Sequence, residues 1–292
     1  MDDFFIFVNI LIQMKMKKYT TILLLVLVTT IALAQKKEKV KGSKTVTTEL
    51  KEVDRFNALE VADNLEVSLE RGEKNELKIE ADDNLHDIIS AEVRDNILRI
   101  FTSKEAVNYK KLMVRITYTA DFNSVTAKNN TVINAIQELQ LNAITFNTQD
   151  NSQLYLNVNT KNFILQSDDK SKIELNLKSE NATIELSKNA ALKALINSVD
   201  LKCDVYEKAN ANLEGDVTNA VIRMDNNSVL TGNKLTVKNA DLTTESYSNC
   251  SLFAETTITI DAKEKSEIQL LGNPKIEIRQ FADEAKLLKK LK

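Results

Sequence analysis

Acidic side chains recur at one place in a repeated alternation of polar and apolar residues. Glu185 and Asp204, about 19 residues apart, are the clearest pair. Two carboxyl groups on the outward face of a strand can act as acid and base in cleaving a polysaccharide. Lys202 and Arg223 interrupt the row, however, and mixed charges favour a solvated, ion-paired surface. Asp204 and Glu185 are therefore candidate catalytic residues only if the chain is an enzyme, which we do not expect.

The only histidine, His86, lies in the acidic stretch 82–87. Its spacing to the acids matches no zinc or calcium motif, so we predict an exposed turn rather than a metal site. A single histidine without a nearby cysteine excludes nucleophilic triads and His-based metal centres. We expect neither a metal nor a cofactor. The net charge of -3, from 39 basic and 42 acidic residues, also leaves no basic field for nucleic acid.

Aromatic side chains that could stack on a sugar are few. The sequence has no Trp. The aromatic residues that could point outward share no single column of the repeat: they are Tyr155, Tyr206, Tyr247 and Phe253. Binding through rows of Asn, Ser and Thr is an alternative, but no site stands out.

The elements that must position these residues are short strands in a repeat. Residues 173–177 and 182–186 alternate apolar and polar side chains, which predicts strands with one buried face. Steps of about 19 residues from Ala182/Ile184 recover the same pattern nine times. The pairs are Val125/Ala127, Ile144/Phe146, Phe163/Leu165, Ala182/Ile184, Leu201/Cys203, Ala220/Ile222, Ala240/Leu242, Ile258/Ile260 and Ile276/Ile278.

A second apolar series precedes the first in each repeat, with looser spacing. Its members are Leu154/Leu156, Ile173/Leu175, Leu192/Ala194, Leu213/Gly215, Leu230/Gly232, Leu252/Ala254 and Ile268/Leu270. A fixed period over nine repeats is typical of a solenoid, in which stacked coils share one continuous core. We predict an all-β fold, a parallel β-helix with two strands per coil. Leu165, Ile184 and Cys203 should be neighbours on successive coils.

Asparagine or aspartate precedes the apolar pair in five successive repeats. We call these residues the Asn column: Asn162, Asn181, Asp200, Asn219 and Asn239. Such residues tolerate the left-handed conformation and can hydrogen-bond to copies above and below. The column predicts one corner of the solenoid, although a general turn preference would also produce it.

The predicted fold decides whether the two cysteines can form a disulfide. Cys203 occupies an inward slot, and Cys250 aligns with Ser152 and Ser171 near a corner. The coils that carry them are about three steps apart, roughly 14 Å, which is too far for a disulfide. We predict that both are free thiols.

The chain divides into five segments. Residues 1–34 have the basic, apolar and small-residue regions of a signal peptide, with Met14 or Met16 as the expected start; the alternative is a membrane anchor. Residues 35–48 are a predicted flexible linker, and 49–120 a β region that caps the solenoid of residues 121–280. Residues 281–292 are a predicted capping helix, or a helix that binds a membrane surface. The mature chain should have no stable membrane span.

Several β runs resemble the opening of a known family, the head GIN domain of putative auto-transporter adhesins. The runs are Arg55–Phe56, Leu59–Val61, Asn64–Leu69, Leu77–Asp82, Val114–Tyr118 and Asn123–Ala127. The resemblance covers essentially the whole mature chain. It implies a right-handed single-stranded β-helix, exported by a Gram-negative bacterium, with no agreed activity or functional residues. Where members often have glycines, this chain has Lys128-Asn129-Asn130.

The expected function is a non-enzymatic envelope or surface protein. It would act by adhesion or as a scaffold, binding a glycan or an envelope or matrix protein through its strand faces. The periplasm, the outer surface and the extracellular space are all compatible with the predicted export. A carbohydrate-active enzyme and a periplasmic assembly or stress partner are the alternatives.

Overall fold

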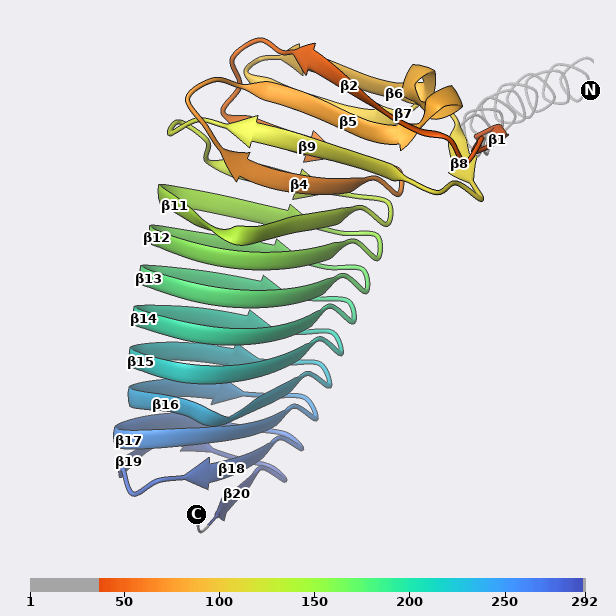
Figure 1. Cartoon of the computed structure of the whole chain (residues 1–292). Coiled ribbons are helices and arrows are strands. Elements are labelled where there is room, and N and C mark those ends of the chain that lie inside the picture. Colours follow the sequence, from red (N-terminus) through yellow and green to blue (C-terminus); the bar gives the residue numbers. More distant parts are fainter. Residues whose placement is uncertain (1–36, 291–292) are drawn as a thin grey trace, which may run out of the picture. The chain divides into compact units, whose positions relative to one another are not determined.

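The computed structural model describes residues 37–290, so the predicted signal peptide lies outside the described residues. The described residues are nearly all β. Residues 40–290 belong to one compact unit, in which stacked parallel strands form a β-solenoid of about nine turns with about 19 residues per turn (Figure 1). The predicted fold class is therefore confirmed.

Each coil of the solenoid is one long β run followed by a tight turn. The runs are β11 (Val132–Thr148), β12 (Gln153–Ser167), β13 (Lys172–Leu186), β14 (Ala191–Val205), β15 (Asn210–Met224), β16 (Val229–Thr244) and β17 (Asn249–Ala262). In β13 the buried alternation changes phase at Glu180 and Asn181, both exposed, because the run bends there from one sheet into the other. We call the parts before and after this bend the first and second half of each coil.

The register confirms the predicted stacking. Leu165 pairs with Ile184, and Ile184 pairs with Cys203, each on neighbouring parallel strands. All three side chains are fully buried. The same order continues through Ile222, Leu242 and Ile260. This column is the centre of the apolar core between the two sheets.

Three of the residue pairings predicted between neighbouring coils were wrong by two residues. Val125 pairs with Phe146 rather than Ile144. In the first half, the slots equivalent to Leu192/Ala194 are filled by Ala211/Leu213 rather than Leu213/Gly215, and by Cys250/Leu252 rather than Leu252/Ala254. The period of this series is therefore regular. An extra residue lies between the two halves of β16, whose register with β15 shifts between Asn212 and Glu214.

The tight corner is built from two consecutive residues in the left-handed region. Asp150 and Asn151 have φ values of 56° and 59°, and Gln149 accepts a hydrogen bond from the N–H of Ser152. This is a type I′ turn, which usually requires Gly, Asn or Asp. The other pairs are Asn129–Asn130, Asp169–Lys170, Lys188–Asn189, Glu207–Lys208, Asn226–Asn227 and Ser246–Tyr247. Asn129–Asn130 thus forms the same tight turn without glycine.

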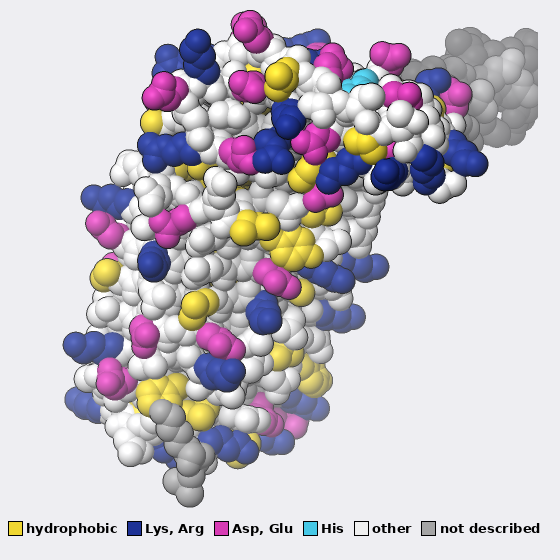
Figure 2. Space-filling view, in the orientation of Figure 1, with side chains coloured by type: hydrophobic (Ala, Val, Ile, Leu, Met, Phe, Trp, Pro, Cys, Tyr) yellow, Lys and Arg dark blue, Asp and Glu magenta, His cyan; other side chains and the backbone are white. Residues whose placement is uncertain are grey.

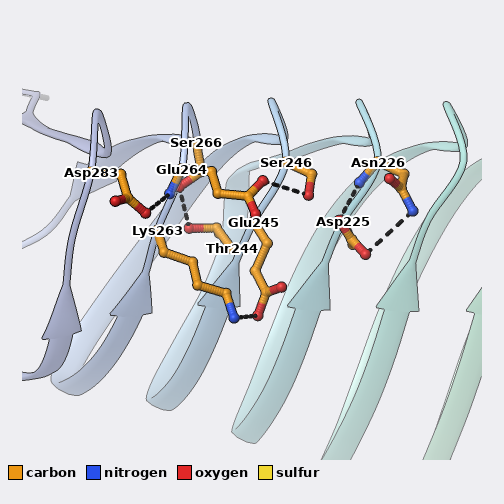
Figure 3. A network of polar contacts seen from close by, with 9 residues as sticks. All are labelled: Asp225, Asn226, Thr244, Glu245, Ser246, Lys263, Glu264, Ser266 and Asp283. Carbon is orange, nitrogen blue, oxygen red and sulfur yellow. Dashed lines mark hydrogen bonds and ion pairs between the residues drawn. The ribbon is translucent and has the colours of Figure 1, made fainter.

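Hydrogen bonds between coils stabilise these turns. The N–H of Asn151 donates to the carbonyl of Asp169, and that of Asn189 to the carbonyl of Glu207. Side chains add to this ladder where Ser246 Oγ donates to Glu264 and Lys263 pairs with Glu245 at 2.9 Å (Figure 3). Left-handed Lys, Glu and Tyr residues are tolerated because stacking satisfies their backbone groups.

The Asn column lies at the other corner, and its residues do not adopt the left-handed conformation. No member is among the positive-φ residues of the described chain. The strand bends gently here, so no sharp turn is needed. The side chains do form a ladder: Asn181 donates to Asn162 at 3.0 Å, Asn219 to Asp200 at 2.9 Å, and Asn239 to Asn219 at 3.1 Å.

An N-terminal β region closes one end of both sheets, as its β-rich sequence predicts. It comprises β2 (Val46–Glu52), β3 (Ala58–Val61), β4 (Glu66–Arg71), β5 (Glu76–Asp82), β6 (Ile89–Arg94), β7 (Ile97–Thr102), β9 (Leu112–Tyr118) and β10 (Ser124–Ala127). One sheet runs β2-β5-β9-β4 into the first half of β11, and the other runs β6-β7-β3-β10 into its second half. A short 3-10 helix, η2 (Asp83–Ile88), connects β5 to β6.

The predicted flexible linker over residues 35–48 is wrong at residues 39–41 and 46–48, which form strands. Strand β1 (Lys39–Lys41) pairs with β8 (Glu105–Val107), and β2 begins at Val46. Polar, lysine-rich sequence can form an edge strand when its backbone completes an existing sheet. Here β2 extends β5 antiparallel, with Val46 opposite Asp82.

The predicted C-terminal helix is also wrong. Strands β18 (Glu267–Leu271), β19 (Lys275–Phe281) and β20 (Lys286–Lys289) continue the stack. β19 pairs with β17 and β20 with β18, both parallel. Phe281, Ala285 and Leu288 have helical spacing, but this segment forms strands because β17 and β18 provide backbone hydrogen-bond partners for it.

Both cysteines are free and buried. Cys203 stacks between Ile184 and Ile222. Cys250 does not share the column of Ser152 and Ser171; it pairs with Leu230 and points into the core. Burial raises the pKa of both thiols to about 12, and Asp204 and the Cys203 thiol, respectively, reinforce the shift.

We expect neither thiol to react with an alkylating reagent in the folded protein, because the thiolate is the reactive species and water does not reach either sulfur. Mass spectrometry after a short exposure should show no label. The same exposure in denaturant should label both residues. Native labelling as fast as that of the denatured chain would contradict this burial.

Candidate functional site

The two candidate catalytic carboxylates are neighbours. Glu185 and Asp204 are paired residues on β13 and β14, and Arg223 follows on β15. Lys202 Nζ lies 3.3 Å from Asp204 Oδ2. Asp204 is only 6% exposed, and its Oδ1 has no hydrogen-bond partner. The structure thus brings the pair together but covers one member, so Asp204 does not face an open substrate site.

Tyr206 shares this acidic environment. Burial, together with the charges of Asp204 and Glu185, raises the pKa of Tyr206 to about 12. A tyrosine this weakly acidic stays neutral at physiological pH and is a poor general base. With Lys202 and Arg223 beside the acids, the cluster resembles a compensated surface more than a catalytic pair.

His86 is less exposed than the sequence predicts. Its side chain is 12% exposed, beneath β2, where Nε2 lies 2.9 Å from Thr47 Oγ1 and Nδ1 lies 3.3 Å from Glu49. The antiparallel pairing of β2 with β5 brings these residues over the 3-10 helix. Within residues 37–290 no group of three or more His, Cys, Asp or Glu side chains could hold a metal.

A groove lies on the first half of five successive coils, β11 to β15. Its volume is about 610 Å³. Five parallel strands span roughly 19 Å along the solenoid axis, so the groove suits an extended ligand. This face carries a few hydrophobic side chains between acidic and basic ones (Figure 2). The outward lining residues are Ile136, Tyr155, Asn157, Glu174, Asn176, Lys193, Leu195 and Glu214.

The middle of the groove is an amide ladder. Asn176 Nδ2 donates to Asn157 Oδ1 at 3.1 Å, which leaves the Asn176 carbonyl oxygen facing the groove as an acceptor. Glu174 and Lys193 are paired in register on β13 and β14, yet neither forms an ion pair within the described chain. The groove therefore offers amide, carboxylate and ammonium groups that a ligand can use.

Apolar surface flanks these polar groups. Tyr155 is 36% exposed, and its hydroxyl donates to Gln153 Oε1 at 3.1 Å. Ile136 and Leu195 are 77% and 46% exposed. The sequence identified Tyr155 as an outward aromatic but not the groove, because the groove depends on the bulge in β11 between Ala135 and Leu139. The bulge interrupts the 19-residue period, and this interruption was the one sign of the groove in the sequence.

Comparison with known proteins identifies the family of the chain. The family described as putative auto-transporter adhesin, head GIN domain, matches residues 55–195 and 174–274. The chain belongs to this family. The head GIN match covers both the N-terminal cap and most of the solenoid, as the resemblance in the sequence implied. No curated protein matches the chain.

Solved structures share the fold. A putative adhesin from Parabacteroides merdae is 17% identical over 86% of this chain and 100% of that chain, with a TM-score of 0.61. A putative adhesin from Parabacteroides distasonis is 15% identical, with the same coverage and a TM-score of 0.60. A putative lipid binding protein from the same species is 14% identical, again with that coverage, at 0.57. At these identities the likeness shows the fold alone.

No helix within residues 37–290 has the length and apolar character needed to cross a bilayer.

Proposed function

We propose that this head GIN protein is an exported envelope or surface protein of the adhesin type that binds a glycan chain through the β11–β15 groove. The observation that carries the proposal is the groove itself, with an aromatic ring beside amide and charged groups. Pyranose rings stack their C–H faces on aromatic rings, and their hydroxyls pair with amides and carboxylates. The family name and the predicted signal peptide support a place outside the cytoplasm.

Several features favour binding over turnover. The groove contains Glu174 and Glu214, but Glu214 is paired with Lys234 at 3.1 Å. The candidate catalytic pair Glu185 and Asp204 lies on the second half of the coil, outside the groove. A long, open, shallow surface of this kind suits recognition of a polymer along its length.

We expect Tyr155→Ala to weaken glycan binding by roughly 5- to 30-fold, since an aromatic contact of this kind contributes about 1–2 kcal/mol. A glycan array followed by calorimetry on the bound glycan would measure it. Tyr247→Ala is the matched control, because Tyr247 is an exposed tyrosine (54%) on a turn away from the groove. Equal affinities for the two variants, or no glycan bound by the parent, would overturn the proposal.

A further inference from the structure

The C-terminal end of the solenoid leaves apolar side chains uncovered. Ile276, Ile278 and Phe281 pair with the buried Ile258, Ile260 and Ala262, so they occupy inward slots of the last coil. They are 42%, 51% and 43% exposed because no described strand covers that side. Leu287, in the inward slot below Ile268, and Leu288 (39% exposed) complete what we call the end face.

Four lysines surround this end face. They are Lys275, Lys286, Lys289 and Lys290, and none forms an ion pair within residues 37–290. Lys289 pairs with the buried Leu270, so it stands in an inward slot on the end face. The acidic residues nearby are mostly engaged: Glu284 pairs with Lys265, and Asp283 accepts the N–H of Glu264. Glu277 and Asp283 form no ion pair within residues 37–290, so the end face combines apolar groups with four lysines and two carboxylates, a net positive charge.

A second copy is a poor occupant for this surface. Two end faces meeting about a two-fold axis would bring the same lysines together, which is unfavourable. The edge of β19 is also irregular, since its register with β17 shifts between Ile260 and Asp261. Bulges and lysines are the usual features that prevent strand edges from pairing with another chain.

We propose that the end face binds an anionic lipid surface. Lysine ammonium groups would contact lipid phosphates, while Ile276, Ile278 and Phe281 enter the headgroup–acyl boundary, as at other basic amphipathic surfaces. Headgroups and water can satisfy the free backbone groups of β19 and β20. Attachment by the end of the solenoid leaves the side faces, including the groove, free for another ligand.

The test is flotation with phosphatidylglycerol–phosphatidylcholine vesicles, using residues 35–292, without the predicted signal peptide. We expect binding at low salt that falls steeply as salt rises, and little binding to phosphatidylcholine alone. Lys286→Glu/Lys289→Glu should weaken binding roughly tenfold or more. Ile278→Asp should weaken it by a similar factor, because it removes apolar contact and adds repulsion.

Matched controls separate this site from general charge and folding effects. Lys172→Glu/Lys238→Glu makes the same charge change on exposed solenoid positions, and Val199→Asp alters a side chain of similar exposure (48%). Both should bind as the parent does. Equal loss in test and control variants, salt-independent binding, or no binding would overturn the proposal. So would a stable dimer in light scattering that Ile278→Asp dissociates, since it would show that a second copy covers the end face.

Discussion

Gly215→Ala is expected to destabilise the solenoid by roughly 3 kcal/mol or more. Gly215 has a φ of 111°, a conformation that residues with a side chain rarely adopt. A β-carbon there would overlap the carbonyl oxygen of Ile196 on the coil above, and a backbone oxygen within a sheet cannot easily move. Strain and overlap therefore act together at this position.

The position of Gly215 explains why it is required. It is paired with Ile196 and Leu235, both fully buried, in a column where the other coils have large inward side chains. The backbone turns away at Gly215, just after the register shift between Asn212 and Glu214. The glycine thus accommodates the irregularity that connects two differently spaced coils.

Urea unfolding monitored by circular dichroism would measure this effect. Gly232→Ala on the next coil is the matched control, since Gly232 lacks a positive φ and a β-carbon there would lie 3.1 Å from both a Leu230 side-chain atom and the Ser251 carbonyl oxygen, against 2.2 Å from the Ile196 oxygen at Gly215. We expect that change to shift the unfolding midpoint much less. Because coils interact mainly with neighbours, Gly215→Ala should also broaden the transition. A midpoint no lower than that of Gly232→Ala would show that the local backbone relaxes.

The fold could be predicted from the sequence because each coil repeats the same constraint. An inward position such as that of Ile184 has an equivalent apolar residue on the coils above and below. The same position therefore occurs nine times in the sequence, and each occurrence supports the predicted period. The alignment failed in β15 and β17 because the weakly apolar Ala211 and Cys250 fill slots that the pattern assigned to the leucines two residues further on. Side chains two positions apart in a strand lie on the same face. A predicted pairing that is wrong by two residues therefore still places apolar side chains on the buried face, and the alternation does not reveal the error.

The ends and the groove were harder to predict for a different reason. Residues 286–289 form a strand because β18 lies beside them, a property of the neighbouring coil rather than of their own spacing. The same holds for β2, which is held by β5. Likewise, Tyr155 and Asn176 meet through stacking and through a bulge on another strand. Tertiary pairing overrides local preference at such places.

The N-terminal cap depends on one buried carboxylate, Asp82. It ends β5 and is fully buried. Its Oδ2 accepts the N–H of Lys44 at 2.8 Å, and its Oδ1 accepts that of Lys111 at 3.0 Å. The N–H of Lys110 lies 3.1 Å from both oxygens. Asp82 thereby joins the segment before β2 to the segment before β9. Gly42 packs against it, with no room for a side chain.

The charge of Asp82 is maintained by these amides. Burial opposes ionisation, but the N–H groups of Lys111, Lys44 and Lys110 outweigh it and lower the pKa of the carboxyl group. A folded-state pKa below the unfolded value means that the contribution to stability is present above about pH 4. It is lost as the pH falls through the folded-state pKa. Cap stability should therefore decline in acid.

Asp82→Asn should lower the melting temperature by roughly 5–10 °C at neutral pH, because the amide nitrogen would face backbone donors. The variant should also lose less stability than the parent between neutral pH and pH values below about 4, since it lacks the titrating group. Asp83→Asn, at the exposed neighbour, is the matched control and should retain the parent's pH dependence. Hydrogen exchange would localise the change to β2, β5 and β9. Exchange rates in β2, β5 and β9 equal to those of the parent would contradict this prediction. They would show that the four amide contacts of Asp82 do not stabilise the cap.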